Sequence, residues 1–193
     1  KEKDCKLIIT VDCGITGADV IEFAYSLGIK VIVTDHHEAP ENLPKCEAII
    51  DAKVKGETYP FKELCGAGVA GKVVEALSGR EIIKKYIDLM ALATVADLVP
   101  LTGENRAIVA AGLMYMNKYP RPGIRGLSKY AKGEEEIITS YHLGFRYGPM
   151  INACGRLGHA SDCVNLMTTS NPERIASLSE KLYRYNEERK RIE

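Results

Sequence analysis

The first fifty residues combine short apolar runs with one amphipathic segment. Leu7 to Val11 is an apolar, β-branched run, which is typical of a buried strand. Residues 17–27 place apolar side chains at helical spacing, and Gly28 ends that pattern. Residues 30–35 and 47–51 are two further apolar runs, so we expect strands there as well. A strand, a helix and a strand in close succession predict a βαβ unit with parallel strands.

After residue 65 the apolar positions recur mainly at the spacing of helices. Asn171-Pro172-Glu173 indicates a helix start, because Asn can cap a helix and Pro suits its first turn. The charged residues that follow predict a last helix, which we expect to leave the globule as a connector. Helices are expected over residues 68–78, 81–96, 104–117, 122–132, 139–147 and 160–169, and from Pro172 toward the end. This order predicts an α/β fold with a parallel βαβ sheet, a mainly helical region and a long C-terminal helix.

Composition narrows the class of protein. Hydrophobic residues make up 46% of the 193 residues and charged residues 27%, which is ordinary for a soluble globular protein. The formal net charge is zero, so no global basic field indicates nucleic acid, although a local groove can be basic in a neutral protein. Six cysteines without a CxxC pair favour reduced thiols and a cytoplasmic location. The longest apolar stretch, residues 87–101, contains Asp88 and Asp97, so we expect no membrane span.

Chemistry-bearing residues follow two of the expected strands. Asp12 comes directly after the first strand, and Asp35, His36 and His37 come directly after the second. Because parallel strands end at the same edge of a sheet, we expect Asp12 and His36 to converge. Carboxylate and imidazole groups together suit Mn²⁺, Fe²⁺ or Zn²⁺, with Mg²⁺ possible where oxygen ligands dominate. The alternative is that the aspartates cap the turns that follow the strands.

Asp97 is a third candidate ligand. It follows the apolar segment "ALATVA", where an unpaired buried carboxylate would be destabilising. Contact with a metal would compensate for its burial. The alternative is an exposed helix end beside Pro100.

A glycine-rich segment resembles a nucleotide-binding loop without matching one. Gly66, Gly68 and Gly71 have the spacing of a dinucleotide fingerprint, and Lys72 follows as in a phosphate-binding loop. However, Val73 stands where a metal-binding hydroxyl is needed, and no buried strand precedes the segment. We therefore expect a helix start that allows close backbone approach, near a phosphate.

Five segments in this order carry a family resemblance: "VDCGI", "VTDHHEAP", "CGAGVA", "TVADLVPL" and "GPMINACGRLGHA". Together they resemble the DHH phosphoesterase superfamily, and within it the RecJ-type exonucleases specific for single-stranded DNA. "TGENR" and the final "LYRYNEERKRIE" strengthen the resemblance. It implies a two-metal phosphodiesterase of DNA repair and recombination that uses Mn²⁺ or Mg²⁺ and acts from 5′ to 3′.

The resemblance also implies roles for residues. Asp12 would be a bridging metal ligand, and His36 and Asp97 would complete the metal site from this chain. His37 would lie against the scissile phosphate or leaving group, and Asp35 would orient a ligand.

Further residues would face the DNA phosphates. Asn152 and Arg156 match such positions, and a guanidinium suits this task. His159 could lie in the substrate groove or cap a helix. Other candidate cations for the groove, each of which could equally be a solvated surface residue, are Arg121, Arg125, Lys129 and Lys132.

The chain departs from the family pattern in three ways. The aspartate-rich first motif would lie upstream of a chain that opens without an initiator Met, and the second DNA-gripping lobe would lie beyond Glu193. Met150 stands where an Arg is expected. The resemblance thus divides the chain into a partial DHH core over residues 1–135, a phosphate-binding helical segment over 136–170 and a connector helix over 171–193. We expect the chain alone to hold metal weakly and to be nearly inactive.

Two other functions remain open. One is a phosphodiesterase for short oligonucleotides or cyclic dinucleotides, and the other is a non-catalytic scaffold that binds single-stranded DNA or protein. Retention of the candidate ligands argues against the scaffold, and "GPMINACGRLGHA" with the final helix favours the RecJ type over the short-substrate type.

Overall fold

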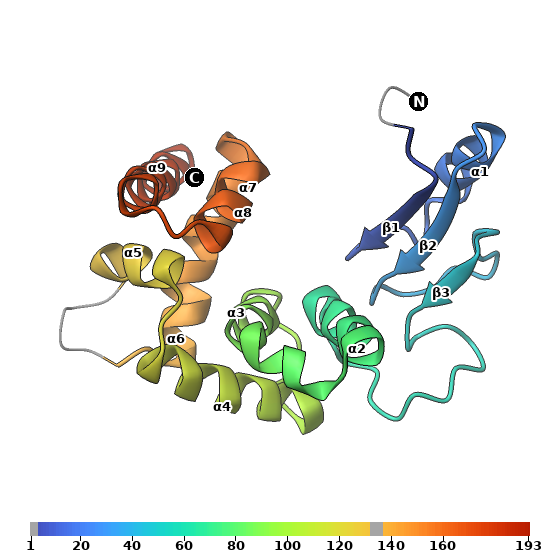
Figure 1. Ribbon diagram of the computed structural model, residues 1–193, viewed down its shortest axis with the longest axis horizontal. Coiled ribbons are helices and arrows are strands. Elements are labelled where there is room, and N and C mark those ends of the chain that lie inside the picture. Colours follow the sequence, from blue (N-terminus) through green and yellow to red (C-terminus); the bar gives the residue numbers. More distant parts are fainter. Residues whose placement is uncertain (1–3, 132–136) are drawn as a thin grey trace. The chain divides into compact units, whose positions relative to one another are not determined.

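The computed structural model describes residues 4–131 and 137–193 and divides into two compact units. The first unit comprises Lys1–Tyr86 and Val99–Asn105, and the second comprises Ile87–Leu98 and Arg106–Glu193. Figure 1 shows the helices and strands of both units. The family resemblance implies a different division, into functional segments that end at residues 135 and 170, and this division stays a prediction.

The first unit is built on a three-stranded parallel sheet with the order β1-β2-β3. Thr34, the last residue of β2, is paired with Val11 at the end of β1 and with Ile50 at the end of β3. The strands therefore end together, as the βαβ pattern predicts. The elements of this unit are β1 (Leu7–Val11), α1 (Ala18–Ser26), β2 (Lys30–Thr34), β3 (Ala48–Ile50), α2 (Gly66–Ser78) and the 3₁₀ segment η1 (Arg80–Lys85).

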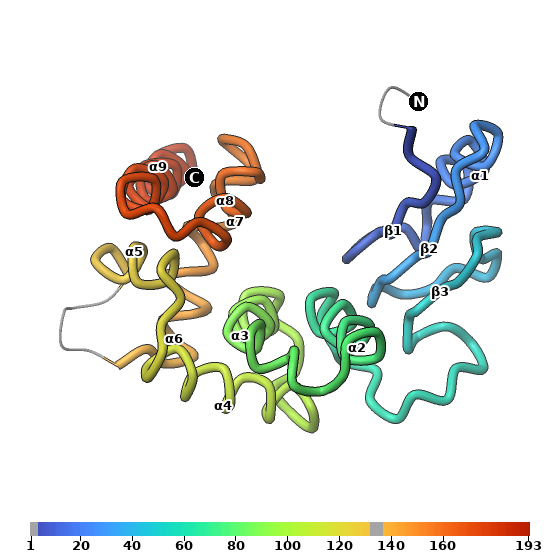
Figure 2. Tube along the Cα trace, viewed as in Figure 1, coloured from blue at the N-terminus to red at the C-terminus, as the bar shows by residue number. Residues whose placement is uncertain are grey.

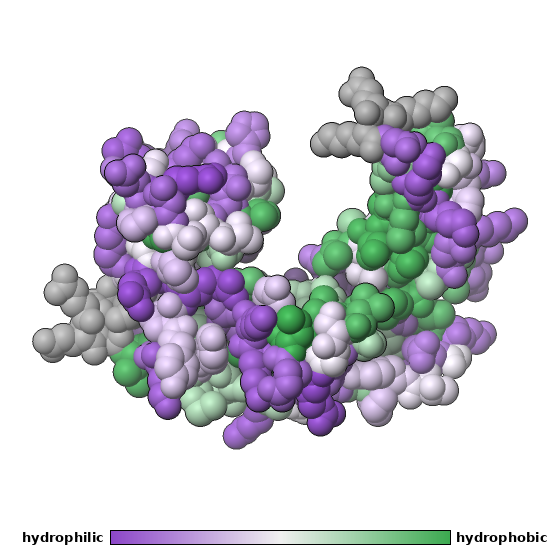
Figure 3. Space-filling view, in the orientation of Figure 1, coloured by the Kyte–Doolittle hydropathy of each residue, from purple (hydrophilic) through white to green (hydrophobic). Residues whose placement is uncertain are grey.

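The core of this unit lies between α1 and β2. Ile21 and Ala24 of α1 pack with Val31 and Val33 of β2, and all four side chains are buried. β1 was predicted to be a buried strand, which is wrong: Ile9 is 50% exposed. The reason is topological, because β1 is an edge strand of this sheet and has β2 as its single neighbour. Its apolar side chains contribute to the hydrophobic surface in Figure 3.

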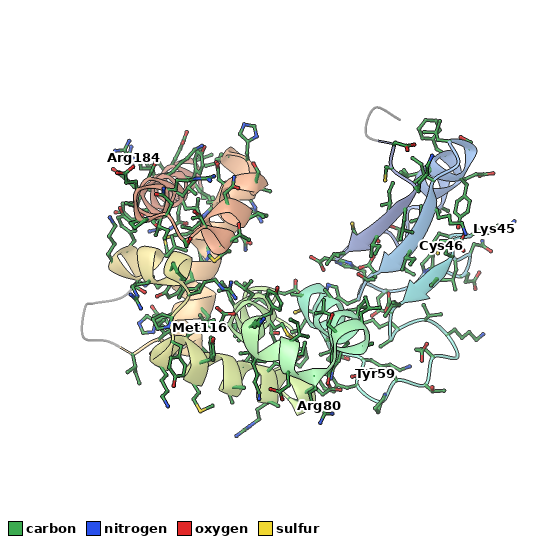
Figure 4. All side chains as sticks on the ribbon, in the orientation of Figure 1. Lys45, Cys46, Tyr59, Arg80, Met116 and Arg184 are labelled. Atoms are coloured by element: carbon green, nitrogen blue, oxygen red, sulfur yellow. The ribbon has the colours of Figure 1, made fainter. Side chains whose placement is uncertain are left out.

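A long connection runs from β3 to α2, as the trace in Figure 2 shows. Tyr59 of this connection (labelled in Figure 4) donates from its hydroxyl to Glu104 at 2.8 Å. Lys72 of α2 lies 2.6 Å from the same carboxylate. The buried Asn105 donates from Nδ2 to the carbonyl oxygen of Glu63. The "TGENR" segment therefore anchors this connection to the first unit.

The second unit is helical. Its core includes Met116 (labelled in Figure 4), Ile124, Tyr147 and Leu182, all of which are fully buried. The first residues of α4 are counted with the first unit. The elements are α3 (Ile87–Ala96), α4 (Gly103–Lys118), α5 (Pro122–Ala131), α6 (Ser140–His142), the π-helical segment η2 (Leu143–Tyr147), α7 (Gly148–Leu157), α8 (Ala160–Thr168) and α9 (Pro172–Ile192).

Two helix predictions need correction. The helix expected over residues 81–96 is divided at Tyr86 into η1 and α3. The helix expected over 139–147 continues through η2 into α7, which the sequence reading missed. Gly148-Pro149 suggests a break, but Pro lies in the first turn of α7, where its missing N–H is tolerated. The π-helical turn before it is the local adjustment that keeps the helix continuous.

The last helix packs within the second unit. α9 contacts α5, α7 and α8, and it buries Ser179, Leu182 and Asn186. The side chain of Asn171 caps it by accepting from the backbone N–H of Arg174 at 3.0 Å, as the sequence predicts. The last helix was expected to leave the globule, and this is wrong for the part of the helix up to Asn186. Its role as a connector stays a prediction. Among the described residues, no helix is both long and apolar enough to cross a membrane.

Candidate metal centre

The end of β1 turns sharply at Asp12. Its backbone has φ of +64°, a left-handed conformation that is uncommon outside glycine, and its N–H donates to the carbonyl oxygen of Thr34 at 3.0 Å. The Thr34 hydroxyl donates to the carbonyl oxygen of Thr10 at 2.6 Å. These bonds fix the end of β1 against β2, so the carboxylate of Asp12 is held at the edge of the sheet. Strain of this kind is frequent at functional sites.

Asp35 is a buried hydrogen-bond acceptor at the end of β2. Its Oδ2 accepts from the backbone N–H of Ile15 at 3.0 Å. Its Oδ1 accepts from the backbone N–H of His36 at 2.8 Å and from Nδ1 of His37 at 2.7 Å. Burial by itself would raise the pKa of Asp35, but these hydrogen bonds outweigh it, so the pKa lies below its ordinary value. Asp35 is therefore ionised at neutral pH and joins the two strand-end loops.

The two histidines face different partners. Nε2 of His36 lies 3.0 Å from Oδ1 of Asp12, and the His36 side chain is 11% exposed. This distance confirms the expected convergence of the two strand ends. The ionised Asp35 carboxylate can only accept, so Nδ1 of His37 donates in that hydrogen bond. The rings of His36 and His37 are 4.4 Å apart between centroids.

Asp12, His36 and His37 form a group that can hold a metal ion. Each offers one ligand atom, and these atoms lie within 4.8 Å of one another. A carboxylate oxygen and two imidazole nitrogens fit a first-row divalent cation such as Mn²⁺. A histidine ligand that donates its other ring N–H to a carboxylate is a common arrangement at metal centres, and His37 with Asp35 has it.

The glycine-rich start of α2 lies against this group. A Cβ atom on Gly66 would be 2.1 Å from Oδ1 of Asp12, so only glycine fits there. The expected close approach of the glycine-rich backbone is thus confirmed. Within this unit the group that it approaches is the Asp12 carboxylate, whereas a phosphate was expected. Lys72 is paired with Glu104, which holds its ammonium group away from a phosphate-binding role.

Asp51 is a site neighbour that the sequence reading missed. It follows β3, is 4% exposed and lines a cavity of about 220 Å³ with Leu64 and Val69. Its Oδ1 accepts from the backbone N–H of Lys53 at 2.9 Å. Burial raises the pKa of Asp51, and the charge of Asp35 adds to this rise. Asp51 could have been predicted from the sequence in the same way as Asp12 and Asp35, because it also comes at the end of an expected strand.

The predicted phosphate-binding residues belong to the second unit. Asn152 and Arg156 are exposed on α7, and Met150, in place of the expected Arg, is 1% exposed and part of the core. His159 occupies the N-cap position of α8, but its side chain makes no capping hydrogen bond. The helix-cap alternative for His159 is thus confirmed for its position only, and its place in a substrate groove stays a prediction.

Asp97 lies at the end of α3, also in the second unit. Its backbone N–H donates to the carbonyl oxygen of Ala93 at 2.9 Å, and the residue is exposed. The premise that Asp97 is buried is wrong, because α3 ends at Ala96 and Leu98 turns the chain outward with φ of +60°. Exposure removes the burial argument for a metal, and the ligand role of Asp97 stays a prediction.

Arg121 is a structural residue. Its Nε and Nη2 donate to the two carboxylate oxygens of the buried Asp88 at 2.8 and 3.0 Å. Its Nη1 donates to the carbonyl oxygen of Met167 at 3.3 Å. Arg121 was a candidate cation for the DNA groove, but its guanidinium group forms hydrogen bonds within the core of the second unit. Lys132, another of these candidates, lies outside the described residues.

Comparison with known proteins places the first half of the chain in a family. Residues 2–94 match the DHH family, N-terminal domain. Residues 2–94 therefore belong to a DHH-family domain. The chain is 40% identical over 192 residues to the single-stranded-DNA-specific exonuclease RecJ of Bacillus subtilis, a match that covers 100% of this chain and 24% of that protein. The resemblance stated from the motifs is confirmed.

Two solved DHH-family structures match the fold. RecJ of Thermus thermophilus in complex with Mn²⁺ has a TM-score of 0.80 and 32% identity, over 96% of this chain and 28% of that chain. The complex of the same protein with Mg²⁺ has a TM-score of 0.69 and 28% identity, over 96% and 26%. These matches confirm the predicted α/β fold class. The chain thus spans about a quarter of the length of these relatives.

Proposed function

We propose that this chain is part of a metal-dependent exonuclease that hydrolyses phosphodiester bonds of single-stranded DNA from 5′ to 3′. The observation that carries the proposal is the convergence of Asp12, His36 and His37, whose ligand atoms lie within 4.8 Å of one another. Relatives with this function match the whole chain. Solved relatives hold Mn²⁺ or Mg²⁺, and the donor set here suits the same ions.

Each residue has a role in this proposal. Asp12, His36 and Asp97 would be the residues of this chain that hold the metal ions, which would supply an activated water and stabilisation of the leaving oxygen. Asp35 orients His37 by accepting from its Nδ1, and His37 would lie against the scissile phosphate or leaving group. Asn152, Arg156 and His159 bind the DNA phosphates, as the family resemblance implies.

The rest of the site lies outside this chain. We place the aspartate-rich first motif upstream of Lys1 in the same polypeptide and the second DNA-gripping lobe beyond Glu193. The exposed apolar side chains of β1 support an upstream partner segment, because an edge strand of this composition is otherwise prone to aggregate. DNA repair and recombination in the cytoplasm, with single-stranded DNA as partner, is the setting that the proposal implies.

The test uses the full-length protein that carries this chain. It is incubated with Mn²⁺ and 5′-labelled single-stranded DNA, the matching duplex, and dinucleotides. We expect digestion of the single strand and little of the duplex. Preference for dinucleotides would indicate the short-substrate phosphodiesterase instead, and cleavage of none would favour the scaffold. His36→Ala provides the matched inactive control.

A further inference from the structure

Tyr141 and Phe145 form an exposed aromatic pair on the second unit. Tyr141 is 54% exposed and Phe145 is 68% exposed, one helical turn apart. Their rings stack on each other with centroids 5.1 Å apart and an angle of 30° between planes. Single exposed apolar side chains are ordinary, but two stacked rings in solvent form a flat apolar surface of a kind that binding sites use.

The pair lies on a helix with two distinct faces. From Ser140 to Leu157 the chain is continuously helical through α6, η2 and α7. The core-facing side chains are Leu143, Tyr147, Met150, Ala153 and Cys154. The opposite face is therefore the one left for a partner, and a π-helical turn such as η2 is frequent at functional sites.

The aromatic pair shares its face with the predicted phosphate ligands. Tyr141, Phe145, Asn152 and Arg156 are all exposed and follow one another at steps of four, seven and four residues. These steps keep side chains on one side of a helix. At 1.5 Å per residue the stripe is about 22 Å long. One end carries stacked rings, and the other carries an amide and a guanidinium.

We propose that Tyr141 and Phe145 form a base-stacking platform that holds single-stranded DNA along the same helix face as Asn152 and Arg156. The proposal rests on the proposed function and names a binding element for its substrate. A single strand presents both bases and phosphates, so it complements the rings at one end and the guanidinium at the other. An apolar polypeptide would complement the rings alone.

The platform carries no base-specific group. Every base has a π-face, so binding by stacking tolerates any sequence. In a duplex the faces of the bases are already stacked on each other, so the platform selects unpaired strands. This is the preference that an exonuclease specific for single strands requires.

The test compares two strands of equal length. The full-length protein, with EDTA present to prevent cleavage, is titrated with a fluorescent thymidine oligonucleotide and with an abasic strand of the same backbone. We expect Phe145→Ala to weaken binding of the thymidine strand about tenfold, which is within the range for one stacked base. Binding of the abasic strand should not change, and Phe145→Trp should restore the affinity for thymidine.

Controls separate the possible failures. Met114→Ala removes an exposed apolar side chain of α4 and should leave both affinities unchanged. Equal weakening on both strands, or none, would overturn the platform while leaving the proposed function in place. A lower thermal unfolding midpoint in Phe145→Ala with unchanged DNA affinity would show that the rings pack on another part of the polypeptide, which also overturns it. If the wild-type protein binds neither strand, the platform is overturned, and the cleavage assay with Mn²⁺ tests the proposed function separately.

Discussion

At the residue scale, Asp35 organises the candidate metal centre through hydrogen bonds rather than as an exposed ligand. We predict that Asp35→Asn destabilises the protein by about 1–3 kcal/mol at pH 7. The NH₂ group of the asparagine side chain would face N–H groups that now donate to the carboxylate, so their hydrogen bonds would be lost. The measurement is urea unfolding, with Glu22→Gln on the exposed side of α1 as the matched control.

The same substitution predicts a pH dependence. The pKa of Asp35 is lower in the folded protein than its ordinary value of 3.8, so its ionised form stabilises the fold above about pH 4. That contribution is lost as the pH falls through the lowered pKa. The difference in unfolding free energy between wild type and Asp35→Asn should therefore shrink below pH 4. A difference that stays constant down to pH 3 would show that Asp35 acts through shape alone.

Gly66 gives a second prediction at this scale. A Cβ atom there would overlap Oδ1 of Asp12, so Gly66→Ala must displace that carboxylate from His36. We expect the affinity of the full-length protein for Mn²⁺ to fall at least about tenfold, as calorimetry would show. Gly155→Ala is the control, because a Cβ atom at Gly155 meets nothing within 4 Å. Equal affinities in the two variants would contradict the close approach.

At the element scale, the Arg121–Asp88 pair joins α3 to the start of α5. Removal of one partner would leave a buried charge, so we expect Arg121→Met to destabilise the protein by about 3–5 kcal/mol in urea unfolding. Arg125→Met, one turn later on the exposed face of α5, should change stability by less than about 0.5 kcal/mol. Similar effects of the two substitutions would mean that the pair contributes little.

The elements also show where sequence reasoning succeeds. Apolar spacing located the parallel strands and most helices, because burial on one face imposes a period. It missed α7, since Gly148-Pro149 is a helix breaker in isolation and only the π-helical turn before it keeps the helix continuous. It misjudged the burial of β1 and Asp97, because burial depends on neighbours that local sequence does not name. Asp12 and His36 were predictable because parallel strands end together.

At the scale of the whole molecule, we propose that the site is divided between this chain and an upstream part of the same polypeptide. We predict that the chain alone binds Mn²⁺ weakly, because Asp12 and His36 offer too few ligands for two cations. Addition of the upstream segment should restore the affinity. Full two-metal affinity of this chain by itself in calorimetry would refute this division.

The central claim is that Asp12 and His36, which converge at the ends of the first two strands, hold a catalytic metal. The most direct measurement is calorimetric titration of the full-length protein with Mn²⁺, in the wild type and in Asp12→Asn and His36→Ala. We predict two bound Mn²⁺ ions in the wild type and at least about a tenfold loss of affinity in each variant, with thermal stability retained in the absence of metal. Unchanged Mn²⁺ affinity in both variants would contradict the account.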